Sequence, residues 1–247
     1  MAYSAFARYY DSLTRNIDYD AVAGHLCDAM KRLNHKPGLT LDLACGTGSL
    51  TVRLAERGID VYGLDASPEM LSIAQRKASA AGHPLFFICQ KMQEMDLAGK
   101  VDTVICILDS INHLISPEDV LRTFRQVSRF LNPGGFFLFD VNTLYKHCFV
   151  LKDHTYVYDL EDIYCVWQNI NARGKGRIGI SLDFFERRGS VYIRSSERFY
   201  ERAYPIKALL AMLKSAGIQP AAVWRGMDFS PPGPRTQRVL IAAEKPE

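Results

Sequence analysis

Apolar segments of strand length alternate with helix-length segments from residue 39 to residue 141, and this alternation strongly constrains the fold of the 247-residue chain. Such an order indicates parallel strands in one sheet, joined by right-handed helical crossovers. The strand segments are almost continuously apolar, as expected where both faces of a sheet are covered. We expect strands at Leu39–Ala44, Ile59–Leu64, Leu85–Cys89, Val101–Leu108 and Gly135–Val141, and helices at Ser49–Arg57, Pro68–Ala81 and Pro117–Leu131.

The pattern changes after Asp140. Aromatic and β-branched runs between residues 154 and 204 are broken by Gly- and Arg-containing segments typical of hairpin turns. A helical pattern and two strand-like segments follow. We therefore predict an α/β fold: a Rossmann-like, doubly wound, mostly parallel sheet with an inserted antiparallel β meander. The expected domains are a core of residues 1–150 and 205–247, with an N-terminal helical lid, and an inserted subdomain of residues 151–204.

Composition and charge exclude several classes of protein. Hydrophobic residues make up 48% and charged residues 23%, which excludes intrinsic disorder. The net charge of +3 is too small to indicate a nucleic-acid partner. No apolar run approaches the roughly 18 residues that a membrane span needs. The six cysteines form no Cys-x-x-Cys pair, so neither a disulfide framework nor a zinc site is indicated. We expect a soluble, cytoplasmic protein without a metal site.

A glycine loop after the first expected strand carries the strongest functional signal. Gly46 and Gly48 let the backbone approach a ligand without a Cβ clash, and the helix that follows presents free N–H groups. A dinucleotide-binding loop would have a third glycine where Thr51 stands, which weakens that interpretation. Asp65 ends the next strand, 19 residues after Gly46. A carboxylate there can accept hydrogen bonds from a ribose diol or cap the helix beginning at Pro68.

These features together resemble class I S-adenosylmethionine-dependent methyltransferases. The resemblance covers roughly residues 6–141 and returns at residues 201–205. With the meander, the chain is similar to small-molecule methyltransferases that have an antiparallel sheet inserted before the last helix. It implies that S-adenosyl-L-methionine (SAM) is the cofactor. The motif residues are Asp42, Ala44, Gly46, Gly48, Asp65, the turn Leu131–Gly135 and the strand end Phe139–Asp140.

The resemblance also implies which residues contact the cofactor. Backbone around Ala44 and Gly46 would meet its methionine part, and Asp65 would hold its ribose. The family usually has an acid that accepts a hydrogen bond from the adenine amino group, but this chain has Lys91 there. Lysine has no acceptor, so Gln90 or a backbone carbonyl has to replace it, or the bond is lost. The expected cofactor contacts are Tyr9, Asp42, Ala44, Cys45, Gly46, Gly48, Asp65, Ala66, Met70, Lys91, Met92 and Leu108.

Candidate catalytic residues lie in two places: directly after the fourth expected strand and in the aromatic N-terminal segment. Ligands of open α/β sheets bind beyond the carboxyl ends of the strands. Asp109 and His113 are therefore candidates to accept a proton or orient a nucleophile, with loop shaping and packing as the structural alternatives. Tyr10, with Tyr9, is a candidate to cover the sulfonium with an aromatic ring. The alternative for this aromatic segment is an amphipathic helix packed on the core.

The expected reaction is in-line methyl transfer to a nitrogen or oxygen of a small molecule, in which alignment matters more than a dedicated base. The chain lacks the Asp/Asn-Pro-Pro-aromatic and Pro-Cys motifs of enzymes that methylate nucleic-acid bases. Five basic residues fall at expected hairpin turns, which favours solvated tips over RNA contacts. An enzyme acting on RNA or protein, and a non-catalytic SAM-binding module, are the alternatives. These basic residues are Arg173, Lys175, Arg177, Arg187 and Arg188.

Overall fold

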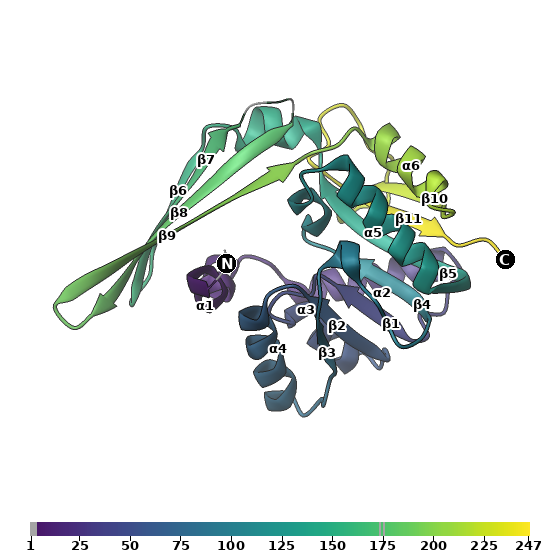
Figure 1. The fold of residues 1–247 in the computed structure, drawn as a ribbon, viewed down its shortest axis with the longest axis horizontal. Coiled ribbons are helices and arrows are strands. Elements are labelled where there is room, and N and C mark those ends of the chain that lie inside the picture. Colours follow the sequence, from purple (N-terminus) through teal and green to yellow (C-terminus); the bar gives the residue numbers. More distant parts are fainter. Residues whose placement is uncertain (1–3, 173, 175) are drawn as a thin grey trace.

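A seven-stranded sheet and a four-stranded antiparallel sheet form the β structure of the computed structural model, which describes residues 4–172, 174 and 176–247. In the large sheet, β11 runs antiparallel to both of its neighbours, and the other neighbouring strands are parallel. The expected fold class is thus confirmed (Figure 1). In spatial order, the strands are β10 (Gln219–Arg225), β11 (Arg238–Glu244), β5 (Leu131–Asn142), β4 (Val101–Cys106), β1 (Thr40–Leu43), β2 (Val61–Asp65) and β3 (Phe87–Cys89).

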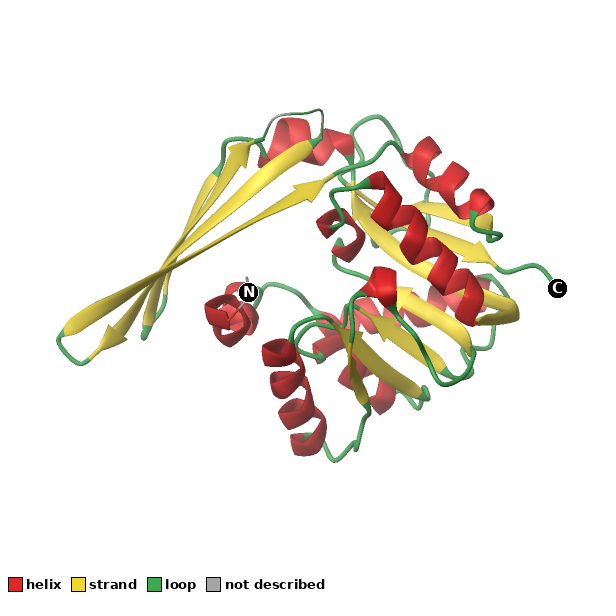
Figure 2. Ribbon diagram, viewed as in Figure 1, coloured by secondary structure: helices red, strands yellow, loops and turns green. Residues whose placement is uncertain are grey.

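Helices cover both faces of the large sheet (Figure 2). Helices α5 (Pro117–Phe130) and α6 (Ile206–Ser215) bury their apolar side chains against one face, and α2 (Tyr19–Arg32) and α3 (Ser49–Glu56) against the other. Helix α4 (Pro68–Ala80) contacts β3 and the N-terminal helix α1 (Ser4–Leu13). Among the described helices, none is both long and apolar enough to cross a membrane.

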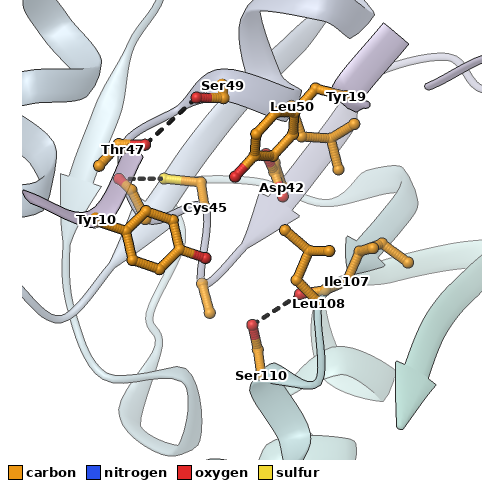
Figure 3. A pocket seen from close by; sticks show the side chains of 12 residues that line it. Tyr10, Tyr19, Asp42, Cys45, Thr47, Ser49, Leu50, Ile107, Leu108 and Ser110 are labelled. Atoms are coloured by element: carbon orange, nitrogen blue, oxygen red, sulfur yellow. Dashed lines mark hydrogen bonds between the residues drawn. The ribbon is translucent and has the colours of Figure 1, made fainter. Parts of the chain in front are cut away.

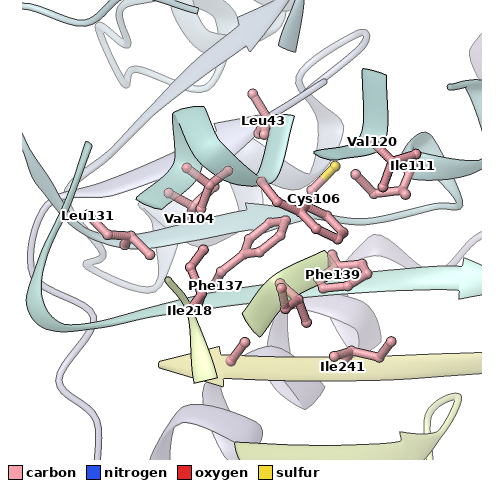
Figure 4. Packing of buried hydrophobic residues seen from close by; sticks show 14 of the residues in the cluster. Leu43, Val104, Cys106, Ile111, Val120, Leu131, Phe137, Phe139, Ile218 and Ile241 are labelled. Atoms are coloured by element: carbon pink, nitrogen blue, oxygen red, sulfur yellow. The ribbon is translucent and has the colours of Figure 1, made fainter. Parts of the chain in front are cut away.

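The core of the large sheet is continuous because alternate residues of its strands are buried on opposite faces. Phe137 and Phe139 stack with their ring centroids 4.6 Å apart (Figure 4). Both rings also contact Phe124 of α5. The neighbouring residues Phe136 and Leu138 point to the opposite face of the sheet, where they pack with residues of α2 and α3. Packing on both faces fixes the positions of the strand ends, where the cavity described below opens.

Strand β5 begins earlier than the expected Gly135. Leu131 already pairs with Val101, and the register then shifts before Thr103 pairs with Phe136. The Asn-Pro-Gly-Gly turn is therefore held against the sheet, since the Gly134 N–H donates to the Lys245 carbonyl. The other expected elements of the core differ from the observed ones only at their ends.

The antiparallel sheet projects from the core as a long twisted ribbon, and α1 lies between this ribbon and α4 (Figure 1). Alternate residues of β8, from Ile178 to Phe184, are buried on its inner face, in one cluster with Phe6 of α1. Arg187 and Arg188 are exposed near the β8–β9 turn, whereas Arg173 and Lys175 lie outside the described residues. Domain boundaries at residues 151 and 204 stay a prediction. The strands are β6 (Thr155–Asp159), β7 (Ile163–Asn171), β8 (Arg177–Arg188) and β9 (Val191–Arg202).

Candidate active site

A cavity of about 390 Å³ opens at the carboxyl ends of β1, β2 and β4, beneath α1. Its volume lies in the range of pockets that bind one small molecule. The candidates Tyr10 and His113 also line it, together with Phe6 from α1. Residues from five separate segments thus converge there. Eight expected cofactor contacts line this cavity: Ala44, Gly46, Asp65, Ala66, Met70, Lys91, Met92 and Leu108.

A smaller space of about 40 Å³ adjoins this cavity and shares Tyr10, Ala44 and Gly46 with its lining. Figure 3 shows Tyr10, Tyr19 and Asp42 gathered around the loop, with Cys45 beside them. Asp42 is buried and accepts a hydrogen bond of 2.6 Å from the Thr51 hydroxyl. Burial raises the pKa of Asp42 to about 7, so this acid has no fixed charge near neutral pH.

The two loop glycines have different roles. Gly46 has a φ of +55°, and a Cβ built on it would meet no atom within 4 Å, so the space beside its backbone is open to a ligand. Gly48 has a φ of +71°, but a Cβ there would lie 2.7 Å from Ala74 Cβ. Gly48 therefore allows α3 to pack against α4 and does not line the cavity.

Three non-glycine residues adopt left-handed backbone conformations at the same strand ends. Their φ values are +60° at Ala44, +60° at Leu108 and +55° at Asp109. Such conformations cost about 1–3 kcal/mol each and occur often at binding sites, where surrounding contacts hold them. Ala44 and Leu108 line both cavities, so the strained backbone shapes the wall that a cofactor would meet.

Asp65 holds the glycine loop through a hydrogen bond to the backbone of Gly46. Its Oδ2 accepts a 2.9 Å hydrogen bond from the Gly46 N–H, and its Oδ1 accepts a 2.8 Å hydrogen bond from the Ser67 N–H. Burial raises the pKa of Asp65, and these N–H donors oppose that rise. Ser67, not Asp65, caps α4, because its hydroxyl accepts from the Met70 N–H. Each carboxylate oxygen keeps a second lone pair for a ligand.

Lys91 stands at the rim of the cavity. Its Nζ lies 3.6 Å from Glu94 Oε2, and 60% of its side chain is exposed. The neighbouring Gln90 uses its amide group on Asp96, accepting from the backbone N–H at 2.8 Å and donating to the carbonyl at 3.2 Å. Because the Gln90 amide is engaged, a backbone carbonyl is the better of the two expected substitutes for the family's acid.

Adjacent tyrosines of α1 point in different directions. Tyr10 is partly buried at the edge of both cavities, and the loss of solvent around its hydroxyl raises the pKa of that group well above the usual value. Tyr9 instead packs on Phe184 of the antiparallel sheet, with ring centroids 6.0 Å apart. Tyr10 is therefore the tyrosine placed to contact a ligand, whereas Tyr9 packs on the antiparallel sheet outside the cavity, and its expected cofactor contact stays a prediction.

Asp11 connects α1 to the glycine loop. Its Oδ1 accepts a 2.7 Å hydrogen bond from the Thr47 hydroxyl, and its Oδ2 lies 2.6 Å from Lys77 Nζ on α4. Lys77 also donates to Thr47 and Ser49. The expected lid is thus a helix held over the cavity by polar contacts with the loop that borders it.

Asp109 is part of an ion-pair network and not a free base. Its Oδ1 lies 2.5 Å from Arg238 Nη2, and its Oδ2 accepts a 2.9 Å hydrogen bond from the Asn142 side chain. Asp140 binds the same arginine at 2.7 Å and accepts from the Asp109 N–H. Burial lowers the pKa of Arg238, but the two carboxylates outweigh this and keep it charged. The loop-shaping alternative for Asp109 is therefore favoured.

His113 ends the short helix η2 (Ser110–His113) and lines the cavity, with one third of its side chain exposed. Its ring stacks on Phe199 of β9 at 5.5 Å. Burial lowers the pKa of His113, so the neutral imidazole, which can accept a proton, predominates at neutral pH. Of the two expected proton acceptors, His113 is the one that faces the cavity.

Three polar residues around the site received no functional role from the sequence: His147, Arg238 and Glu201, although Glu201 lies in the segment 201–205 where the resemblance returns. Glu201 and His147 are buried, and Glu201 lies between the rings of His113 and His147. The spacing of Phe199 and Glu201 was the available signal, because residues two apart on a strand share a face. Glu201 is therefore expected on the same face of β9 as the buried Phe199, which makes this carboxyl group a candidate functional residue.

Comparisons with known proteins agree with this geometry. Residues 40–135 match a family model described as a methyltransferase domain. The chain is 35% identical over 246 residues to YqeM of Bacillus subtilis (strain 168), which is named as a methyltransferase. The match covers 99% of this chain and 98% of that protein. A glycine/sarcosine N-methyltransferase of Halorhodospira halochloris is 35% identical over 128 residues, 50% of this chain and 48% of that protein.

A solved structure is similar over the full length. It is an S-adenosylmethionine-dependent methyltransferase from Clostridium acetobutylicum ATCC 824, 30% identical, with a TM-score of 0.88 and 99% of each chain covered. The chain belongs to the class I S-adenosylmethionine-dependent methyltransferases. It is therefore an enzyme, its cofactor is SAM, and the non-catalytic alternative is set aside.

Proposed function

We propose that this methyltransferase acts on a nitrogen or oxygen nucleophile of a small molecule. The observation that carries the proposal is the cavity itself: it begins at the glycine loop and Asp65 and ends at Tyr10 and His113, beneath α1. When bound, SAM supplies an electrophilic methyl group on a sulfonium.

The residues of the cavity fit the adenosyl part of SAM. The open space beside Gly46 admits a ligand against the backbone, and Asp65 keeps lone pairs directed at the same cavity. Met70 and Met92 offer polarisable side chains to an aromatic ring. In this arrangement Asp65 holds the ribose and the two methionines hold the adenine, which leaves Tyr10 and His113 for the reacting end.

The small size of the remaining space favours a small acceptor. A cavity of about 390 Å³ holds one ligand of ordinary size, so SAM takes up most of it. Helix α1 covers the remainder, and the inner face of the antiparallel sheet packs on that helix. The glycine/sarcosine N-methyltransferase of Halorhodospira halochloris, which matches about half of this chain, is consistent with such an acceptor.

The chain's own contribution to the reaction is positioning and desolvation. Tyr10 and His113 border the reacting end, where the methyl group and the nucleophile have to be aligned. Phe6 and Phe199 place apolar surface beside them and exclude water. The neutral His113 imidazole is the group in the cavity best suited to receive a proton from the acceptor.

A transfer experiment with methyl-labelled SAM tests the proposal. Purified enzyme is incubated with a panel of small amines and phenols, with bulk RNA and with a protein mixture, and labelled product is measured in each. We expect label in a small molecule, and at least a tenfold lower rate for His113→Ala. Label only in RNA or protein would contradict the proposal. Arg122→Ala, an exposed change on α5, is the control.

A further inference from the structure

A buried carboxylic acid lies directly behind His113. Glu201 stands on the inner face of β9, two residues after Phe199, and 5% of its surface is exposed. Its Oε1 lies 3.8 Å from His113 Nε2, and its Oε2 lies 3.6 Å from His147 Nε2. His147 belongs to the short helical segment η3 (Lys146–Leu151) and is itself buried. Three titratable side chains from different parts of the chain therefore meet behind the cavity.

The contacts of His147 determine its tautomer. Its Nδ1 lies 2.9 Å from the Gly176 carbonyl oxygen. A carbonyl can only accept, so Nδ1 carries the hydrogen. In the neutral ring, Nε2 is then an acceptor, and among the described residues this buried atom has no hydrogen-bond partner. The nearby Glu201 carboxyl group is placed to share a proton with it.

Burial and nearby charges act on the pKa of Glu201 in opposite directions. Burial raises the pKa of Glu201 to about 8, the Asp109 carboxylate adds to that rise, and Lys146 and Arg238 oppose it. The acid therefore changes its protonation state close to neutral pH. The titratable and charged groups that face it are His113, His147, Asp109, Lys146 and Arg238.

We propose that Glu201 is a positioning residue of the methyl transfer, which receives through His113 the proton that the acceptor loses. This rests on the proposed function. The acceptor's lone pair forms the new bond to the methyl carbon, and the electron pair of the broken S–C bond stays on sulfur. The acceptor's proton goes to His113, and a proton of His113 passes to Glu201. The 3.8 Å separation fits a free enzyme, in which catalytic hydrogen bonds are often long.

The coupling between Glu201 and His113 can be measured without any acceptor. The His113 ring is followed by ¹⁵N NMR against pH, in protein saturated with S-adenosylhomocysteine and assigned with His113→Gln. We expect two inflections in the wild type, the upper one near pH 8, and loss of the upper one in Glu201→Gln. Asp183→Asn, which removes a carboxylate from the outer face of the same sheet, should keep both.

Two results would overturn the assignment. One is an identical His113 titration in Glu201→Gln and the wild type, with unchanged affinity for S-adenosylhomocysteine. The other needs no variant: a single inflection for His113 in the wild-type protein. The second result decides the matter if Glu201→Gln fails to fold.

Kinetics add a readout that a purely structural role would not move. With the small molecule that takes up label in the panel, the wild-type rate should rise with pH through about 8. Glu201→Gln should lose this rise and be about 10²-fold slower above pH 8, with unchanged binding of SAM. An unchanged pH profile would contradict the proposal. Failure of the proposed function would appear separately, as absence of labelled small molecule with the wild-type enzyme.

Discussion

At the scale of single residues, the proposed position of the cofactor depends mainly on Asp65, which would hold the ribose. Removing its carboxylate should weaken binding of S-adenosylhomocysteine by about 2–4 kcal/mol, because two charge-assisted hydrogen bonds to the ribose are lost. Asp65→Ala is compared with the wild type by calorimetric titration of S-adenosylhomocysteine.

Because Asp65 also binds the Gly46 and Ser67 N–H groups, loop loosening has to be separated from ribose binding. A 2′,3′-dideoxy analogue of the ligand makes this separation. The wild type should bind the analogue more weakly than S-adenosylhomocysteine, whereas Asp65→Ala should bind both alike. Equal discrimination by the two proteins would refute the ribose contact.

Lys91 replaces an acid, and an acid in its place should strengthen binding. Lys91→Asp supplies the carboxylate acceptor that the family usually has at this position, and we expect binding to tighten by about 1 kcal/mol, a typical net value for one hydrogen bond. Lys91→Ala is the matched control, because it removes the lysine without adding an acceptor. Unchanged or weaker binding of S-adenosylhomocysteine by Lys91→Asp would count against the adenine position.

Asp42 makes the stability of the ligand-free protein depend on pH. Its pKa is about 7 when folded, against an ordinary 3.8. Between these values the folded protein binds more protons than the unfolded chain, so the free energy of unfolding falls as pH rises through this window. Three pKa units correspond to at most about 4 kcal/mol.

Asp42→Asn removes this titration. The variant should melt at a higher temperature than the wild type at pH 8, and the difference should shrink toward pH 4. The exposed Asp60→Asn should show no such pattern. A variant that melts below the wild type at pH 8 would show that Asp42 is charged and stabilising in the folded protein.

At the scale of elements, α1 is held by apolar packing on the antiparallel sheet and by the polar contacts of Asp11. Asp11→Ala removes the bonds to Thr47 and Lys77, and we expect binding of S-adenosylhomocysteine to weaken by about 1 kcal/mol and proteolysis between α1 and α2 to become faster. Arg8→Ala, a second change on α1, breaks an exposed ion pair with Glu186 of β8 and should change binding and proteolysis little. Wild-type affinity in Asp11→Ala would mean that α1 does not support the loop.

Several elements could be predicted from the sequence because their signals are local. Continuous apolar runs marked the parallel strands, and Ser67 with Pro68 marked the start of α4. The direction of a side chain within the N-terminal helix was harder. Tyr9 and Tyr10 are neighbours in sequence, but successive residues on a helix point about 100° apart, so only Tyr10 reaches the cavity.

At the scale of the whole molecule, the sequence predicted residues that line the cavity, including His113, but not the buried groups behind His113 or the partner of Asp109. Asp65, Met70 and Met92 lie in a stretch of 28 residues with a characteristic order. Arg238, which engages Asp109, is 129 positions further along the chain, and this contact forms only when β11 pairs with β5. Partners brought together by strand pairing at such separations leave no local pattern.

The central claim is that SAM lies between the glycine loop and Asp65 with its reacting end toward Tyr10 and His113. A crystal structure with S-adenosylhomocysteine tests it most directly. We predict that the ribose hydroxyls contact Asp65, that the adenine lies beside Met70 and Met92, and that the sulfur faces Tyr10 and His113. A ligand bound outside this cavity, or bound there with its sulfur turned toward Met92, would contradict the account.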